Sequence, residues 1–252
     1  MNLEILKNKN YKFIFVFIII KKANNLKEIG KLYLIPTPIG NLEDISLRAI
    51  NILKSVDIIA CEDTRNTGKL LKLLDIPQKK LFAYHNFNES NSAKGIVEQI
   101  KEGKNVGLVS DAGYPLISDP GYSVVNLAKE NSIEVVALPG SSALIPALAA
   151  SGFETDSFIF LGFPPAKKGR KSFVTKASSN IYTTILYESP HKIIRLLDEL
   201  SEVLDERRVS VSREISKVYE EHIQDLPMNI IKYLEKENKV KGEFVVVIER
   251  KK

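Results

Sequence analysis

The chain of 252 residues contains no tryptophan and only one cysteine, Cys61. A single cysteine excludes a framework of internal disulfides and suits a reducing compartment, so we expect a cytoplasmic protein. Because Cys61 lies within the apolar run VDIIAC, we interpret it as a small buried hydrophobe without a chemical role.

Hydrophobic runs long enough to cross a membrane are also lacking. The apolar stretch from Phe13 to Ile20 is much shorter than the roughly 20 residues with which a helix spans a bilayer. Flanking lysines give this stretch some likeness to a secretory signal peptide, but no small-residue cleavage site follows it cleanly. We therefore expect residues 1–30 to be an extension outside the folded part, with a signal peptide as the alternative.

Several common catalytic motifs are missing. No GxGxxG follows the first apolar strand-like run, no phosphate-binding GxxxxGK[ST] occurs, and PGSSA is not the GxSxG of serine hydrolases. The three histidines lie far apart and form no HExxH, so we expect no metal site. The remaining backbone groups, aspartates and small residues would suit a neutral, adenosine-like ligand that carries a positive centre.

The charge balance is mildly basic. The net charge of +5 and the pI near 9.0 favour a polyanionic partner such as nucleic acid, although a solvated basic surface would give the same excess.

Hydrophobic periodicity predicts an α/β fold. From Lys31 onward, short β-rich runs alternate with segments whose apolar residues recur every three or four positions, which is typical of βαβ units and a parallel sheet. Leu47, Ile50 and Leu53 mark the clearest helix, with Asp44 or Ser46 as its N-cap. The predicted strands of this half are KLYLI, VDIIAC, KLFAYH, NVGLVS and IEVVAL.

A second series of strands follows a boundary that we place near residues 150–156. Its predicted strands are SFIFLGF, IYTTILYE, RRVSVSRE and GEFVVVIER, with helices around 193–204 and 227–236. We expect two α/β domains, residues 31–152 with a mostly parallel sheet and residues 153–252 with a mixed sheet.

Unusual loops collect where the predicted strands end. They are PTPIGN, EDTR, SDAGYPLISDPG and LPGSSA. Open α/β sheets bind ligands beyond the carboxyl ends of their strands, so four such loops at one edge predict a binding site there. Each loop taken alone is equally well explained as an ordinary turn.

The order and spacing of these blocks resemble one known family. The blocks LYLIPTPIGNLEDISLRAINILKSVDIIACEDTR, VSDAGYPLISDPGY, LPGSSALIPALAASG, YESPHK and KGEFVVVIE are similar to those of the ribosomal RNA small-subunit methyltransferase I family, within the tetrapyrrole methylase superfamily. The resemblance implies 2'-O-methylation of a cytidine ribose in the decoding centre of 16S rRNA, with S-adenosylmethionine as donor. It also implies a two-domain α/β fold with the donor in the cleft between the domains, and a homodimer that acts on the small ribosomal subunit. Ser141 and Lys192 depart from the family pattern, where proline and arginine are usual.

The resemblance assigns the donor site to three loops. The matching positions are Pro36, Ile39 and Gly40 in the first loop, Asp111, Ala112, Gly113 and Tyr114 in the second, and Gly140, Ser141, Ser142 and Ala143 in the third. A second aspartate turn, with Asp119 and Gly121, either braces the pocket and caps the next helix or contacts the ligand directly.

The general base or orienting group stays open among several strand-end residues. The first candidates are Glu62, Asp63, Arg65, Glu188 and His191, followed by Glu214, Lys217, Lys241 and Glu243. Structural explanations compete with these roles, since Glu62 and Arg65 can form an ion pair and His191 can cap a helix.

The basic segment AKKGRK predicts a contact with the RNA backbone through Lys167, Lys168, Arg170 and Lys171, unless it is only a solvated surface. Two other functions remain open. One is methylation of a small tetrapyrrole, and the other is RNA binding without catalysis, as in ribosome assembly.

Overall fold

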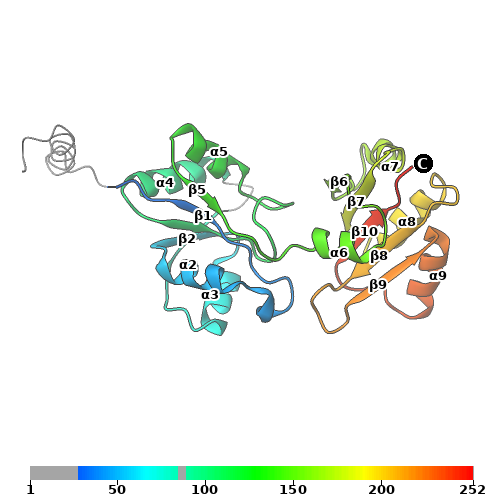
Figure 1. Cartoon of the computed structure of the whole chain (residues 1–252), viewed down its shortest axis with the longest axis horizontal. Helices are drawn as coiled ribbons and strands as arrows, with labels where there is room; N and C mark the ends of the chain where they lie inside the picture. Colours follow the sequence, from blue (N-terminus) through cyan, green and yellow to red (C-terminus); the bar gives the residue numbers. More distant parts are fainter. Residues whose placement is uncertain (1–27, 85–88, 252) are drawn as a thin grey trace, which may run out of the picture.

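The computed structural model describes residues 28–84 and 89–251, and its strands form two separate five-stranded sheets. Most of the predicted extension, residues 1–27, lies outside the described residues. Each sheet, with the helices packed on it, forms one lobe, and the two lobes lie side by side along the long axis of the molecule (Figure 1). In the described ranges, no helix combines the length and the hydrophobicity that crossing a bilayer requires.

The N-terminal lobe contains an entirely parallel sheet. Its strand order is β3-β2-β4-β1-β5, and each neighbouring pair is parallel. The strands are β1 (Leu32–Leu34), β2 (Ile58–Cys61), β3 (Lys80–Ala83), β4 (Val106–Leu108) and β5 (Val135–Ala137). All residues of β2 and β4 are buried, as expected for central strands that helices cover on both faces. The prediction of a parallel sheet is confirmed.

Helices pack on both faces of this sheet. One hydrophobic cluster joins one face to α4 and α5, and another joins the opposite face to α2 and α3. Ser46 is the N-cap of α2, because its side chain accepts a hydrogen bond of 3.0 Å from the Ala49 N–H. The helices of this lobe are η2 (Leu42–Asp44), α2 (Leu47–Ser55), α3 (Thr64–Leu73), α4 (Glu89–Lys101) and α5 (Tyr122–Glu130).

The C-terminal lobe contains a mixed sheet with the order β6-β7-β10-β8-β9. Only the β6–β7 pair is parallel among its described pairs. The strands are β6 (Phe158–Gly162), β7 (Thr183–Glu188), β8 (Val209–Arg213), β9 (Glu221–Asp225) and β10 (Phe244–Ile248). The prediction of a mixed sheet is confirmed. The sequence analysis missed β9, whose single strongly apolar residue, Ile223, gives no strand pattern at this partly exposed edge.

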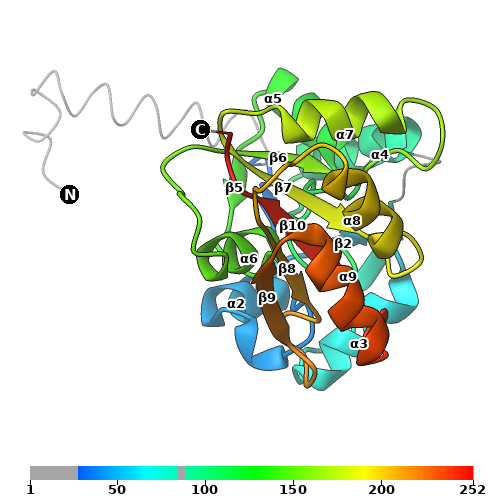
Figure 2. The same cartoon turned by 90° about the vertical axis from the view of Figure 1, so that its right-hand side faces the viewer.

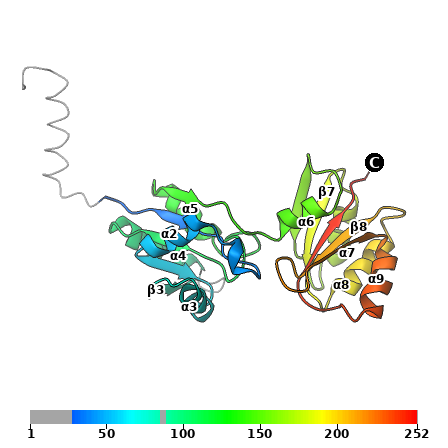
Figure 3. The same ribbon diagram turned by 60° about the horizontal axis from the view of Figure 1, so that its bottom comes forward.

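The two faces of the mixed sheet are covered differently. Helices α7 (Arg170–Ser178), α8 (Ile193–Ser201) and α9 (Pro227–Lys236) bury one face, and Figure 2 shows α8 and α9 in front of the strands. Helix α6 (Leu144–Ala150) packs on the other face, against Val245 and Val247, and lies between the sheet and the N-terminal lobe (Figure 3). The domain boundary near residues 150–156 stays a prediction.

Candidate functional site

The first two predicted donor-site loops are joined by backbone hydrogen bonds. Thr37 and Gly113 exchange two N–H to carbonyl bonds, of 2.9 and 3.0 Å. The buried Thr37 hydroxyl also donates to the Ser110 carbonyl at 3.1 Å. Because β1 and β4 are parallel neighbours, their following loops emerge at the same edge of the sheet. The structure therefore brings PTPIG and SDAGYP together, as predicted from the strand ends.

The backbone conformation at position 113 favours glycine. Its φ of +89° lies in the left-handed region, where side chains are strained. A Cβ built at this position would lie 3.3 Å from Cγ2 of Ile39. The second loop therefore turns directly under the first.

The third predicted loop, PGSSA, packs on the first from the other side. A Cβ at Gly140 would lie 2.7 Å from Cβ of Pro36, so the backbone at Gly140 meets the Pro36 ring at a distance that only glycine allows. The Ser141 hydroxyl donates to the Asp44 carbonyl at 3.2 Å. All three loops thus belong to one packed unit.

A pocket of about 360 Å³ opens where the first and third loops meet the C-terminal lobe. Its volume lies within the usual range of small-ligand sites, about 300–1,000 Å³. Ser216, in the loop between β8 and β9, closes it from the other lobe. The lining residues are Ile39, Asp44, Gly140, Ser141, Ser142, Ile145, Pro146 and Ser216. Hydroxyls and an apolar wall therefore lie together beside the predicted loops.

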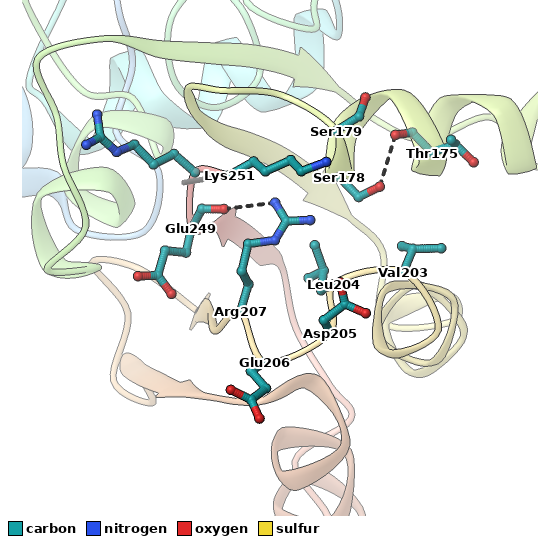
Figure 4. A pocket seen from close by; sticks show the side chains of 11 residues that line it. Thr175, Ser178, Ser179, Val203, Leu204, Asp205, Glu206, Arg207, Glu249 and Lys251 are labelled. Carbon is teal, nitrogen blue, oxygen red and sulfur yellow. Dashed lines mark hydrogen bonds between the residues drawn. The ribbon is translucent and has the colours of Figure 1, made fainter.

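A larger pocket of about 570 Å³ lies elsewhere on the C-terminal lobe (Figure 4). Arg207 lies inside it and donates to the Glu249 carbonyl at 3.5 Å. Its lining carries three acidic and three basic side chains, which are Asp205, Glu206, Glu249, Arg207, Arg250 and Lys251. It contains none of the predicted site residues, and the mixed charge does not favour a polyanion. We therefore place the candidate site at the smaller pocket.

Asp111 links the second loop to the segment EDTR. Its Oδ1 accepts the Asp63 N–H at 3.1 Å and its Oδ2 accepts from the Asn66 side chain at 2.8 Å. The β2 and β4 strands that precede these segments are parallel neighbours. Asp111 therefore orients the loop against the start of α3.

Asp63 and Arg65 form an ion pair at the start of α3. Asp63 is the N-cap, and its Oδ2 lies 2.6 Å from Nη2 of Arg65. Hydrogen bonds from Arg65 hold the pKa of the Asp63 carboxyl far below its usual range. A carboxylate so weakly basic is poorly suited to accept a proton near neutral pH.

Asp119 has the opposite electrostatic environment. Burial, together with the negative charges of Glu62 and Asp111, raises the pKa of its carboxyl to about 6. The Ser110 hydroxyl opposes this shift. The ends of β2 and β4 therefore gather three carboxylates, of which one titrates close to neutrality. Sequence analysis considered Asp119 only as a brace or ligand contact, because burial is not visible in a turn motif.

Tyr187, which sequence analysis did not single out, lies at the end of β7. Burial raises the pKa of its hydroxyl, and hydrogen bonding to Ser142 and to the Leu144 backbone opposes the rise. The negative charge of Asp119 also acts on it. Tyr187 therefore connects the C-terminal sheet to the PGSSA loop.

The structure does not favour the roles predicted for Glu188 and Arg170, because the two side chains pair with each other in the interior. Both side chains are 1% exposed, and Nη1 of Arg170 lies 3.2 Å from Oε2 of Glu188. Arg170 also donates to Glu199 at 2.7 Å. A guanidinium held in this way has no surface for a phosphate, and a carboxylate so paired is not a free base.

The other members of the basic segment are exposed. Lys167, Lys168 and Lys171 have no carboxylate partner within the described part of the chain. His191 is also exposed, in the turn between β7 and α8. These positions stay predictions for RNA contact and catalysis.

A separate ion network lies in the loop after β8. Nζ of Lys217 lies 3.0 Å from Glu214 and 3.1 Å from Glu243. A Cβ at Gly40 would lie 2.4 Å from Cγ of Lys217, so this loop packs directly on PTPIG. Lys241 is exposed nearby in the sequence. We interpret the network as a contact that fixes one lobe against the other.

Residues 31–227 match the family model described as Tetrapyrrole (Corrin/Porphyrin) Methylases. The chain belongs to the tetrapyrrole methylase family. The match covers all three predicted donor loops and every strand of the two sheets except β10.

Relatives within the tetrapyrrole methylases are close in sequence. A protein of Hydrogenobaculum sp. (strain Y04AAS1) is 46% identical over 87% of this chain and 96% of its own length. A Vibrio cholerae protein is 48% identical over 86% of this chain and 76% of its own length. Both are named ribosomal RNA small subunit methyltransferase I. The family resemblance found in the sequence motifs is confirmed.

Solved structures share the tetrapyrrole methylase fold at much lower identity. A cobalt precorrin-4 methyltransferase has a TM-score of 0.62 at 17% identity, covering 87% of this chain and 94% of its own. A diphthine synthase has a TM-score of 0.67 at 12% identity, covering 87% and 90%. The predicted fold class of two α/β sheets is confirmed.

Proposed function

We propose that this protein transfers a methyl group from S-adenosylmethionine to the 2'-hydroxyl of a cytidine ribose in the decoding centre of 16S rRNA, within the small ribosomal subunit. One observation carries the proposal. The first and third loops assigned to the donor line one pocket, and the second is hydrogen-bonded to the first, in a chain that is 46% identical to a ribosomal RNA small subunit methyltransferase I. The family resemblance also supports a cytoplasmic homodimer.

The pocket suits the donor chemically. Ser141 and Ser142 offer hydroxyls for polar groups, while Ile39, Ile145 and Pro146 offer apolar surface for a flat ring. The contact between Pro36 and Gly140 holds the first and third loops together. The Asp111–Tyr114 loop is joined to the first loop by the Thr37–Gly113 hydrogen bonds. When bound, the donor supplies an electrophilic methyl group on a sulfonium.

The acceptor hydroxyl needs a base, because a neutral alcohol is a weak nucleophile. Asp119 is the best-suited carboxylate in this region, since burial brings its pKa to about 6 and it titrates near the operating pH. Asp63 and Glu188 are held by Arg65 and Arg170. We therefore assign Asp119 as the base that accepts the proton of the acceptor hydroxyl. Burial and the neighbouring charge of Glu62 keep the pKa of Asp119 high.

The RNA backbone would be held by the exposed lysines of the basic segment. Lys167, Lys168 and Lys171 carry three positive charges without a described carboxylate partner. Phosphate neutralisation by such side chains supplies affinity without sequence preference.

A tetrapyrrole acceptor is the second candidate. It is favoured by structural neighbours of low identity, such as the cobalt precorrin-4 methyltransferase at 17% and a uroporphyrin-III C-methyltransferase at 16%. An RNA-binding protein without catalysis is the third, and it predicts RNA affinity without donor affinity.

The test is transfer of a labelled methyl group to small ribosomal subunits from cells that lack the endogenous activity, followed by mapping of the modified ribose. A single 2'-O-methylcytidine in the decoding region supports the proposal. Asp111→Ala should lose donor binding in calorimetry, because both contacts to the start of α3 disappear. Donor binding without transfer to subunits would contradict the proposal and direct the assay to tetrapyrroles.

A further inference from the structure

A bulge redirects the chain at the end of β6. Phe160 pairs with Ile185 and Gly162 pairs with Leu186, so Leu161 is an extra residue in the ladder. Gly162 then adopts a left-handed φ of +68°. Bulges of this kind change the direction of the side chains that follow. The next residue, Phe163, is 54% exposed, which is unusual for a phenylalanine directly after a strand.

The ring of Phe163 packs edge-to-face on the ring of Tyr187. Its centroid lies 5.5 Å from that of Tyr187 at an interplanar angle of 66°, and the Tyr187 ring lies 4.8 Å from that of Phe160 at 65°. These edge-to-face contacts fix the orientation of an aromatic ring. Phe163 therefore presents a held ring, with more than half of its surface open.

This ring lies at the junction of the two lobes. A Cβ at Gly162 would lie 3.5 Å from Oγ of Ser118, in the loop after β4. The hydroxyl of Tyr187 interacts with Ser142, which lines the candidate pocket, and is within the electrostatic reach of Asp119. Phe163 is thus near the residues proposed for the donor and for the proton.

The segment that follows Phe163 is basic and anchored. Arg170 donates to the Pro165 carbonyl at 3.3 Å, and Arg195 donates to the Ala166 carbonyl at 3.4 Å. Lys167 and Lys168 follow these two anchored carbonyls directly and are exposed. An open ring beside positive charges has the composition of a surface that holds a nucleotide, with the ring for the base and the lysines for the phosphates.

We propose that Phe163 stacks on the nucleobase of the target nucleotide and so directs its ribose toward the candidate pocket. This inference rests on the proposed function, because an RNA acceptor is required. An enzyme that acts on a nucleotide in folded RNA must remove it from its neighbours, and an aromatic ring replaces the stacking that is lost. Tyr187 braces Phe163 and is too enclosed to take the base itself.

The test compares four variants of the full chain in the small-subunit assay. Phe163→Ala and Phe163→Leu remove the aromatic ring, and Phe163→Trp keeps one. Phe158→Ala is the matched control, because Phe158 is 40% exposed at the opposite end of the same strand. Base stacking on an aromatic ring supports a loss of about 5- to 100-fold in kcat/KM for Phe163→Ala, mainly through KM.

The expected pattern is a similar loss for the alanine and leucine variants, near-normal activity for the tryptophan and Phe158→Ala variants, and unchanged donor affinity in all four. A leucine variant as active as the original chain would overturn stacking and leave only apolar contact. Normal RNA affinity together with a changed oligomeric state in Phe163→Ala would assign the ring to an interface between copies, and would also overturn the proposal.

Failure of the inference and of the proposed function give different results. If the unmodified chain methylates subunits and Phe163→Ala does so equally well, only the stacking proposal fails. If the unmodified chain binds the donor but methylates no subunits, the proposed function fails, and the stacking proposal fails with it.

Discussion

Arg170 and Glu188 form an ion pair of 3.2 Å in which each side chain is 1% exposed. The pair joins the first residue of α7 to the last residue of β7. Because Arg170 also holds the Pro165 carbonyl, the pair fixes the basic segment to the end of β7, which carries Tyr187. A residue from the basic motif thus supports the proposed RNA surface without forming part of it.

Breaking this pair should be costly. Arg170→Met leaves the Glu188 carboxylate buried without its partner, and we expect the free energy of unfolding to fall by about 3–5 kcal/mol. Chemical denaturation measures this loss. Arg195→Met is the control, because Arg195 pairs with Glu199 on the surface at 2.9 Å and should change stability by less than about 1 kcal/mol. Equal effects of the two substitutions would contradict the assignment.

Asp119→Asn should raise the stability of the protein while it lowers the rate of methyl transfer. The folded state raises the pKa of Asp119 from 3.8 to about 6, so the folded protein binds this proton more tightly than the unfolded chain does. The ionised carboxyl therefore lowers stability as pH rises from about 4 to about 6, and the cost persists above that range. We expect Asp119→Asn to stabilise the protein by about 1 kcal/mol at pH 7.5, after allowance for solvent screening, and by almost nothing at pH 3.5.

The same substitution should reduce methyl transfer by roughly 10²- to 10⁴-fold, the usual contribution of a general base. In the unmodified chain, the rate should fall as the pH drops through about 6, because Asp119 becomes protonated. Single-turnover assays from pH 5 to 8.5 measure this profile. A transfer rate for Asp119→Asn equal to that of the unmodified chain would remove Asp119 as the base.

Gly113→Ala should weaken donor binding through the backbone and through contact with Ile39. The position has a φ of +89°, and the new Cβ would lie 3.3 Å from the Ile39 side chain. Gly169→Ala is the matched control, because Gly169 has a φ of +83° with nothing within 4 Å of a new Cβ. We expect both variants to lose about 1–2 kcal/mol of stability and only Gly113→Ala to lose donor affinity in calorimetry.

Neutralising the basic segment should reduce the salt dependence of RNA binding. For Lys167→Gln with Lys168→Gln, we expect the slope of log K against log salt to fall by about 0.7–0.9 for each phosphate contact removed. Lys232→Gln with Lys236→Gln, both exposed on α9, controls for the loss of two positive charges. An unchanged slope in the double variant would place the RNA on another surface.

Local sequence determined the framework of this protein. The buried run IIAC and its parallel neighbours follow from uninterrupted apolar residues, and the loops of the site follow from glycine and proline at the strand ends. These features depend on residues that are close together in the chain, so they can be inferred without a structure. The edge strand β9 was missed because pairing with β8, and not its own pattern, defines it.

Tertiary structure alone decided which charged side chains are free. Lys168 and Arg170 are two residues apart in one basic motif, yet Lys168 is exposed and Arg170 is buried against carboxylates 18 and 29 residues away in sequence. Asp119 owes its raised pKa to burial and to Glu62 from another strand end, and Phe163 owes its exposure to a bulge. Burial and electrostatic fields depend on distant segments, and a linear motif does not contain them.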